Sequence, residues 1–116
     1  MDLQNIVKII VFEPGIKPYL SEINGSLQGF RETIKGKNND FSEAIKLDFK
    51  EIEVENLEKD VLIQMVFSEN GISLRMKQNS HTENVMGTFI VVKSEENQFV
   101  GLEKQEIKLI IKHFKT

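Results

Sequence analysis

The sequence contains no cysteine and only two histidines among its 116 residues. Without cysteine, a disulfide framework and a thiolate zinc site are both excluded, and the composition fits a reducing cytosol. No apolar run approaches the about 20 residues that a membrane-spanning helix needs. The opening residues 1–5 lack the basic start and apolar run of a signal peptide. We therefore expect a cytoplasmic protein without a membrane anchor.

The residues that catalysis requires are scarce as well. His113 stands among lysines near the end of an expected helix, a place typical of a solvated side chain. His81 lies in a polar loop, beside Ser80, Thr82 and Glu83. Neighbours in sequence do not make a catalytic triad, because triads assemble in space from distant segments. The sequence has no metal-binding or phosphate-loop motif. We expect no enzyme activity, no metal site and no cofactor.

Size and charge narrow the possible classes of function further. A chain of 116 residues fits one domain, 1–116, with a single core and little room for a deep substrate cleft. The net charge is −3, the lysines are scattered, and the densest charge cluster is acidic. Nucleic-acid binding through phosphates usually requires a basic face, so direct nucleic-acid binding is disfavoured.

The first half of the chain predicts a hairpin followed by a helix. Residues 6–12 are β-branched and almost all apolar, which is typical of a central strand buried on both faces. Residues 18–23 alternate and predict a partner strand near an edge, because Pro18 cannot donate to a ladder. Ser26 is placed to cap a short helix that Gly36 would end.

The apolar pattern of residues 43–60 changes parity part-way. Leu47 and Phe49 alternate on odd positions, whereas Ile52 and Val54 alternate on even ones. A straight strand would turn its apolar side outward at this point, so we expect a bulge, or two short strands, or one bent strand.

The second half predicts more strands and a final helix. Residues 61–67 form a strand, and Asn70-Gly71 predicts a tight hairpin into a return strand over residues 72–76. A further strand covers residues 85–93, and residues 99–101 add a short rung after a turn. An apolar stripe at helical spacing predicts the closing helix: Ile107, Ile110, Ile111 and Phe114.

These elements predict an α+β domain. We expect a mixed or mainly antiparallel sheet of about five to seven strands with two helices, one after the first hairpin and one at the C-terminus.

A family resemblance rests on three stretches of the chain: "FEPGIKPYLSEINGSLQGF", "MGTFIVVKSEENQF" and "LEKQEIKLIIKHF". They resemble a family of small proteins of unknown function carried by bacterial phages, plasmids and conjugative elements. The matching residues are Glu13, Pro14, Gly15, Lys17 and Pro18 in the turn, Ser26 and Leu27, Gly87, Thr88, Phe89 and Ile90, and Gln105, Glu106 and Ile107. The resemblance implies the order of the elements and makes the first hairpin a structural signature. It brings no enzyme motif.

The middle of the chain departs from that family. Its members carry Gly-Gly after the first helix, where this chain has Lys35-Gly36-Lys37. They also carry Pro-Asn-Arg after the central hairpin, where the nearest match is Asn79.

One acidic segment is the candidate binding site. Glu51, Glu53 and Glu55 recur at every second residue, so on a strand their side chains share one face. Neighbouring carboxylates would then lie about 6.6 Å apart, which is close to the spacing of phosphates along an extended nucleic acid. Glu58 and Asp60 extend the line. Such a ridge fits a basic groove, or it is a solvated strand face that prevents edge aggregation. Lys17 and Tyr19 are possible secondary contacts.

Two functions of different classes follow. The first is a mobile-element protein that disarms host immunity, an anti-CRISPR inhibitor that binds a Cas9-type nuclease and blocks loading of guide RNA or target DNA. The second is an accessory module for replication or transfer of the element, which would bind nucleic acid through Lys35, Lys37, Lys46 and Lys50. Neither predicts a small-molecule substrate. The oligomeric state stays open, with strand addition near Pro18 or at the acidic strand as the route to a dimer.

Overall fold

The computed structural model of the chain describes residues 5–35, 44–57 and 60–115. Within these residues the chain forms six strands and two helices, and this confirms the predicted α+β class. The elements are β1 (Ile6–Phe12), β2 (Tyr19–Asn24), α1 (Leu27–Lys35), β3 (Leu47–Glu51), β4 (Leu62–Ser68), β5 (Phe89–Glu95), β6 (Gln98–Val100) and α2 (Lys104–His113). None of the described helices is long and apolar enough to cross a bilayer.

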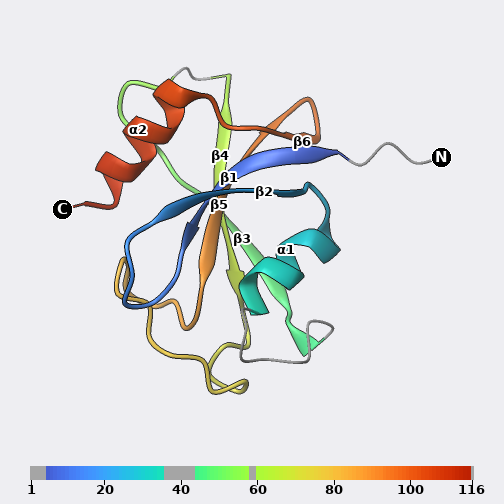
Figure 1. The fold of residues 1–116 in the computed structure, drawn as a ribbon, viewed down its shortest axis with the longest axis vertical. Helices are drawn as coiled ribbons and strands as arrows, with labels where there is room; N and C mark the ends of the chain where they lie inside the picture. Colours follow the sequence, from blue (N-terminus) through green and yellow to red (C-terminus); the bar gives the residue numbers. More distant parts are fainter. Residues whose placement is uncertain (1–4, 36–43, 58–59, 116) are drawn as a thin grey trace.

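The strands form one sheet in the order β2-β1-β5-β4-β3, and β6 pairs with β5 (Figure 1). Every described strand pair is antiparallel. As predicted, β1 is an interior strand and β2 lies at an edge. The other edge is β3, the strand that leads into the acidic segment.

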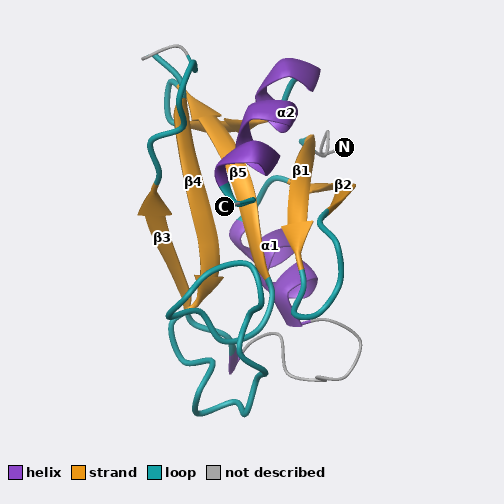
Figure 2. Ribbon diagram, turned by 90° about the vertical axis from the view of Figure 1, so that its left-hand side faces the viewer, coloured by secondary structure: helices purple, strands orange, loops and turns teal. Residues whose placement is uncertain are grey.

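The sheet has an apolar cluster on each face, because the two helices cover opposite sides of it (Figure 2). Phe30 of α1 is buried in the first cluster together with Ile9 of β1. Ile110 of α2 is buried in the second cluster together with Ile10 and Phe12. Successive side chains of a strand point to opposite faces, so β1 contributes to both clusters.

This two-sided packing corrects the prediction of a bulge or bend near residue 50. Leu47 and Phe49 pack against the α1-side cluster, whereas Ile52 and Val54 pack against the α2-side cluster. The register with β4 continues unbroken, because the Ile52 N–H donates to the Ile63 carbonyl at 2.9 Å. The change of parity is therefore a change of the face that is covered, and the pairing with β4 continues past the end of β3 to Ile52 without a bulge.

The hairpin predicted at Asn70-Gly71 is wrong. A type I′ turn needs positive φ at both central residues, and neither residue has it. The Asn70 side chain instead holds the start of β3, accepting from the Lys46 N–H at 3.1 Å and donating to the Ala44 carbonyl at 2.8 Å. Residues 71–75 form turns in place of the predicted return strand. The strands that pair with β4 are β3 and β5.

A tight hairpin does occur between β5 and β6. Its central residues, Glu96 and Asn97, have φ of 49° and 66°. These values match a type I′ turn. The short rung predicted over residues 99–101 is confirmed as β6, which starts one residue earlier, at Gln98.

Both helices begin at capping residues, and the cap of α1 is Ser26, as the sequence indicates. The Ser26 hydroxyl accepts the Gly29 N–H at 3.1 Å, which satisfies one of the free donors of α1. At α2, the Glu106 carboxylate accepts the Glu103 N–H at 2.8 Å. Gly36, predicted to end α1, lies outside the described residues.

Candidate functional site

The predicted acidic residues gather at the end of the β3–β4 hairpin, which we name the acidic tip. Its described members are Glu51, Glu53, Glu55 and Asp60, and all four are exposed. The chain turns at Asn56, whose φ is 69°. Since β4 then runs antiparallel to β3, Asp60 lies on the returning chain and does not extend the line of the first three carboxylates. The predicted residue Glu58 lies outside the described residues.

An apolar pocket of about 370 Å³ lies at the acidic tip. Its apolar lining is Ile52, Val54, Leu57, Val61 and Ile63, and Glu51 and Glu53 also border it. Lysine and arginine side chains combine an aliphatic stem with a charged head. The pocket can therefore take such a stem, with Glu51 and Glu53 at its border as partners for the head.

A second acidic turn lies at the same end of the sheet. Leu62 at the start of β4 pairs with Ser94, so the exposed Glu95 and Glu96 follow at the end where the acidic tip lies (Figure 1). Lys93 offsets only part of this charge, because its buried Nζ lies 2.8 Å from the Glu106 carboxylate and 3.9 Å from that of Glu95. The sequence alone does not indicate these two residues as part of the site, because only strand pairing brings them to the acidic tip.

The backbone edge of β3 is closed at Phe49. The Ile52 bond to β4 sets the alternation of the ladder, which turns the N–H of Phe49 outward from the sheet. The Asp48 carboxylate accepts that N–H at 2.9 Å. A partner strand cannot use this donor, and this hinders strand addition at the middle of β3.

The two predicted secondary contact residues belong to the β1–β2 turn. Lys17 is exposed and borders a second pocket of about 610 Å³. The Tyr19 hydroxyl donates to the Glu13 carboxylate within the same hairpin. Partial burial, this hydrogen bond and the negative charge of Glu13, in that order, raise the pKa of Tyr19 to about 12. The phenol is therefore part of the hairpin and not a free contact group.

We expect the folded protein to form tyrosinate near pH 12, above the ordinary tyrosine pKa of 10.0. Tyr19 is the one tyrosine and tryptophan is absent, so ultraviolet absorbance reports on it alone. Because the neutral phenol is favoured in the fold, its contribution to stability is present below pH 10.0 and lost as the pH rises toward 12. Glu13→Gln should move the midpoint toward 10.0. An unshifted midpoint in the unaltered protein would contradict this.

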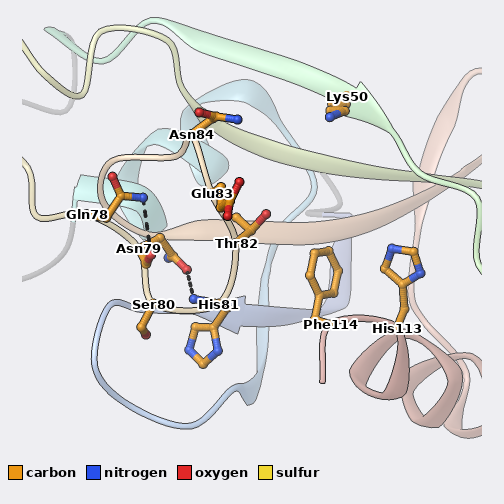
Figure 3. Close-up of a pocket in the computed structure, with 10 residues that line it drawn as sticks. All are labelled: Lys50, Gln78, Asn79, Ser80, His81, Thr82, Glu83, Asn84, His113 and Phe114. Atoms are coloured by element: carbon orange, nitrogen blue, oxygen red, sulfur yellow. Dashed lines mark hydrogen bonds between the residues drawn. The ribbon is translucent and has the colours of Figure 1, made fainter. Parts of the chain in front are cut away.

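An open groove of about 910 Å³ lies on the α2 side (Figure 3). The loop of residues 78–84 forms one side of it, and His113, Phe114 and Lys50 line the rest. Figure 3 shows His81 and His113 well apart and pointing in different directions. No group of three or more potential metal ligands occurs among the described residues.

His81 is held by backbone carbonyls. Its Nε2 lies 2.7 Å from the Ile16 oxygen and 3.2 Å from the Glu13 oxygen. Carbonyls only accept, so Nε2 carries a hydrogen and cannot serve as a base at that atom. The Ser80 hydroxyl accepts the Gly15 N–H at 2.9 Å. These bonds tie the loop to the β1–β2 turn.

Asn79 is the buried centre of this loop and only 3% exposed. Its side-chain amide donates to the carbonyls of Phe12 and Gly87, both at 2.9 Å. Its oxygen accepts the His81 N–H at 2.7 Å. All hydrogen-bonding groups of the amide are thus used, and the residue joins β1, the loop and the start of β5.

Two of the stretches behind the family resemblance meet at the 78–84 loop. The turn at Gly15, with a φ of 82°, and the approach to β5 at Gly87, with a φ of 89°, are both bonded to the 78–84 loop. No family model, curated protein or solved structure matches this chain. The resemblance stays a prediction.

The lysines of the alternative function do not form one surface. Lys35 belongs to α1 and pairs with Glu32 at 3.3 Å, whereas Lys50 lines the groove on the α2 side. Lys46 is exposed at the start of β3. Lys37 lies outside the described residues, so the described lysines of this set are divided between the two faces of the sheet.

Proposed function

We propose that this protein acts without catalysis, by inserting its acidic tip into a basic groove of a partner protein. The observation that supports this best is the combination of exposed carboxylates with an apolar pocket at one end of the sheet. A like-charged cluster attracts a basic surface over a distance and raises the association rate. The pocket then adds apolar contact after the charges have brought the surfaces together.

The partner that we propose is a Cas9-type nuclease of the host. The protein would then be an anti-CRISPR inhibitor that a mobile genetic element encodes. Such nucleases hold guide RNA and target DNA in a positively charged channel through backbone contacts. The acidic tip would compete for that channel and block guide or target loading. The family resemblance, with its mobile-element setting, supports the choice of partner.

The test is a DNA-cleavage assay in which the protein is added before or after the guide RNA. We expect inhibition when the protein is added first and much less when the guide is already bound. No inhibition in either order, across several such nucleases, would contradict the proposal. Salt-dependent binding to nucleic acid alone would then support the accessory module.

Changing Glu51, Glu53 and Glu55 together to lysine is expected to weaken nuclease binding about a hundredfold, since three reversed charges each remove about 1 kcal/mol. The three side chains are exposed, so the fold should be kept. Binding is measured by titration, and folding by circular dichroism.

The matched control reverses three exposed carboxylates away from the acidic tip, Glu32, Glu69 and Glu83. It changes the net charge by the same amount and should bind almost as well as the unaltered protein. Equal losses in both variants would mean that net charge matters and the acidic tip does not.

A further inference from the structure

The second edge of the sheet, β2, differs from β3 in that no described side chain binds its outward backbone groups as the Asp48 carboxylate binds the Phe49 N–H. The Gly25 N–H donates to the Asn5 carbonyl at 2.7 Å, which marks a hydrogen-bonded pair in the β1–β2 ladder. Bonded pairs alternate along an antiparallel ladder, so the odd residues of β2 bond to β1. The bond from the Leu102 N–H to the Lys8 carbonyl agrees, because it shows an even residue of β1 facing away from β2.

It follows that the backbone groups of Leu20 and Glu22 point outward from the sheet. No described residue hydrogen-bonds to them, in contrast to the Asp48 carboxylate that closes β3. In Figure 1, β2 crosses in front of the other strands. This edge is therefore able to accept another strand.

Exposed apolar side chains concentrate around the same edge. Six large hydrophobic side chains are exposed in the described part of the chain, and five of them fall within residues 6–27. They are Ile6, Ile16, Tyr19, Leu20 and Leu27, with 41–51% of each exposed. Such a concentration is typical of an interaction surface.

We propose that β2 pairs antiparallel with β2 of a second copy, with Ser21 on the two-fold axis. In this register the outward backbone N–H and C=O groups of Leu20 bond to those of Glu22 in the other copy. The two-fold axis repeats this pair, so it occurs twice in the dimer. It also sets Tyr19 opposite Ile23 of the other copy, an aromatic and β-branched pair that stabilises antiparallel sheets. The inference does not depend on the proposed function.

The neighbouring registers are less favourable. A two-fold at Glu22 sets two carboxylates directly opposite each other, which destabilises a pair. A two-fold at Leu20 sets Glu22 opposite Pro18, which has no N–H to donate. In the Ser21 register each Glu22 keeps Lys8 of its own β1 as neighbour, so no carboxylate faces another. The strand is thus complementary to itself, and this favours a second copy over a different protein.

A single cysteine tests the register, because the chain has no cysteine of its own. Ser21→Cys should give a disulfide-linked dimer in air. The two residues would form a non-hydrogen-bonded pair with Cα atoms about 4.5 Å apart, within disulfide range. Glu22→Cys is the matched control. Two such cysteines would lie about 8 Å apart, beyond that range, and should link much less. Equal linking at both positions, or more at 22, would overturn the register.

Sedimentation of the uncross-linked protein tests the dimer itself. Leu20→Glu sets a carboxylate opposite Glu22 of the other copy and should weaken the dimer at least about tenfold. Leu20→Lys makes an opposite-charge pair at the same place and should keep the dimer. A protein that is monomeric at high micromolar concentration, or equal effects of the two substitutions, would overturn the proposal.

Discussion

Replacing Lys93 with methionine is expected to lower the free energy of unfolding by about 3–5 kcal/mol. The Lys93 side chain is buried in β5, and its Nζ lies 2.8 Å from a carboxylate oxygen of Glu106 in α2. Methionine fills a similar volume but leaves the Glu106 carboxylate buried without its partner. This would remove a large part of a total stability that is about 5–15 kcal/mol for a domain. Urea unfolding followed by circular dichroism measures the loss.

The double variant Lys93→Met with Glu106→Gln separates the two contributions. Glutamine removes the charge and still offers an oxygen to the Glu103 N–H. Because a buried ion pair often contributes little beyond neutral groups of similar shape, we expect the double variant to recover most of the stability. If Lys93→Met alone costs under about 1 kcal/mol, the pair is solvated and the buried contact is not the reason for its position.

Replacing Asn79 with leucine should cost about 3 kcal/mol, because the substitution leaves three buried or partly buried backbone groups without a partner. These are the carbonyls of Phe12 and Gly87 and the N–H of His81. The loop of residues 78–84 should also become easier to cleave with a protease, since Asn79 bonds it to β1. Unfolding in urea and limited proteolysis report the two effects separately.

Glu83→Leu is the matched control, since Glu83 is exposed in the same loop. Its effect on the free energy of unfolding should stay within about 0.5 kcal/mol. Similar losses in both variants would show that the loop tolerates leucine poorly in general and that the Asn79 bonds are not special.

The strands and helices that local pattern determines were predictable. The β-branched run of β1, the Pro18 signal for an edge, and the Ser26 cap all lie where the sequence indicates. Asn70-Gly71 led to a wrong hairpin prediction. The preference of this pair for hairpin turns rests on its tolerance of positive φ, whereas here the Asn70 side chain hydrogen-bonds to the backbone at the start of β3.

The parity change between β3 and the residues that follow it led to a wrong prediction for a different reason. Alternation predicts a buried and a solvated side only if one face of the sheet is covered, and here helices cover both faces. The strand predicted over residues 85–93 likewise starts later, at Phe89, because Gly87 takes a positive φ.

The candidate site was predictable in its local part only. Exposure of Glu51, Glu53 and Glu55 follows from their alternation with apolar residues. That Glu95 and Glu96 join the same end of the sheet depends on the β4–β5 register, which no local pattern contains. Asn79 reads as one polar residue in a polar loop, and only its buried bonds show its role.

The position of β1 between β2 and β5 also bears on how the chain folds during synthesis. Ile10 pairs with Val91, so a ribosome working at about 5–20 residues per second adds the second partner roughly 4–16 s after the first strand. Until then β1 has one open side, and its most apolar residues have no complete core. The first hairpin and α1 therefore cannot complete their packing until β5 has been synthesised. A chaperone that shields apolar strands is expected to raise the yield of native protein.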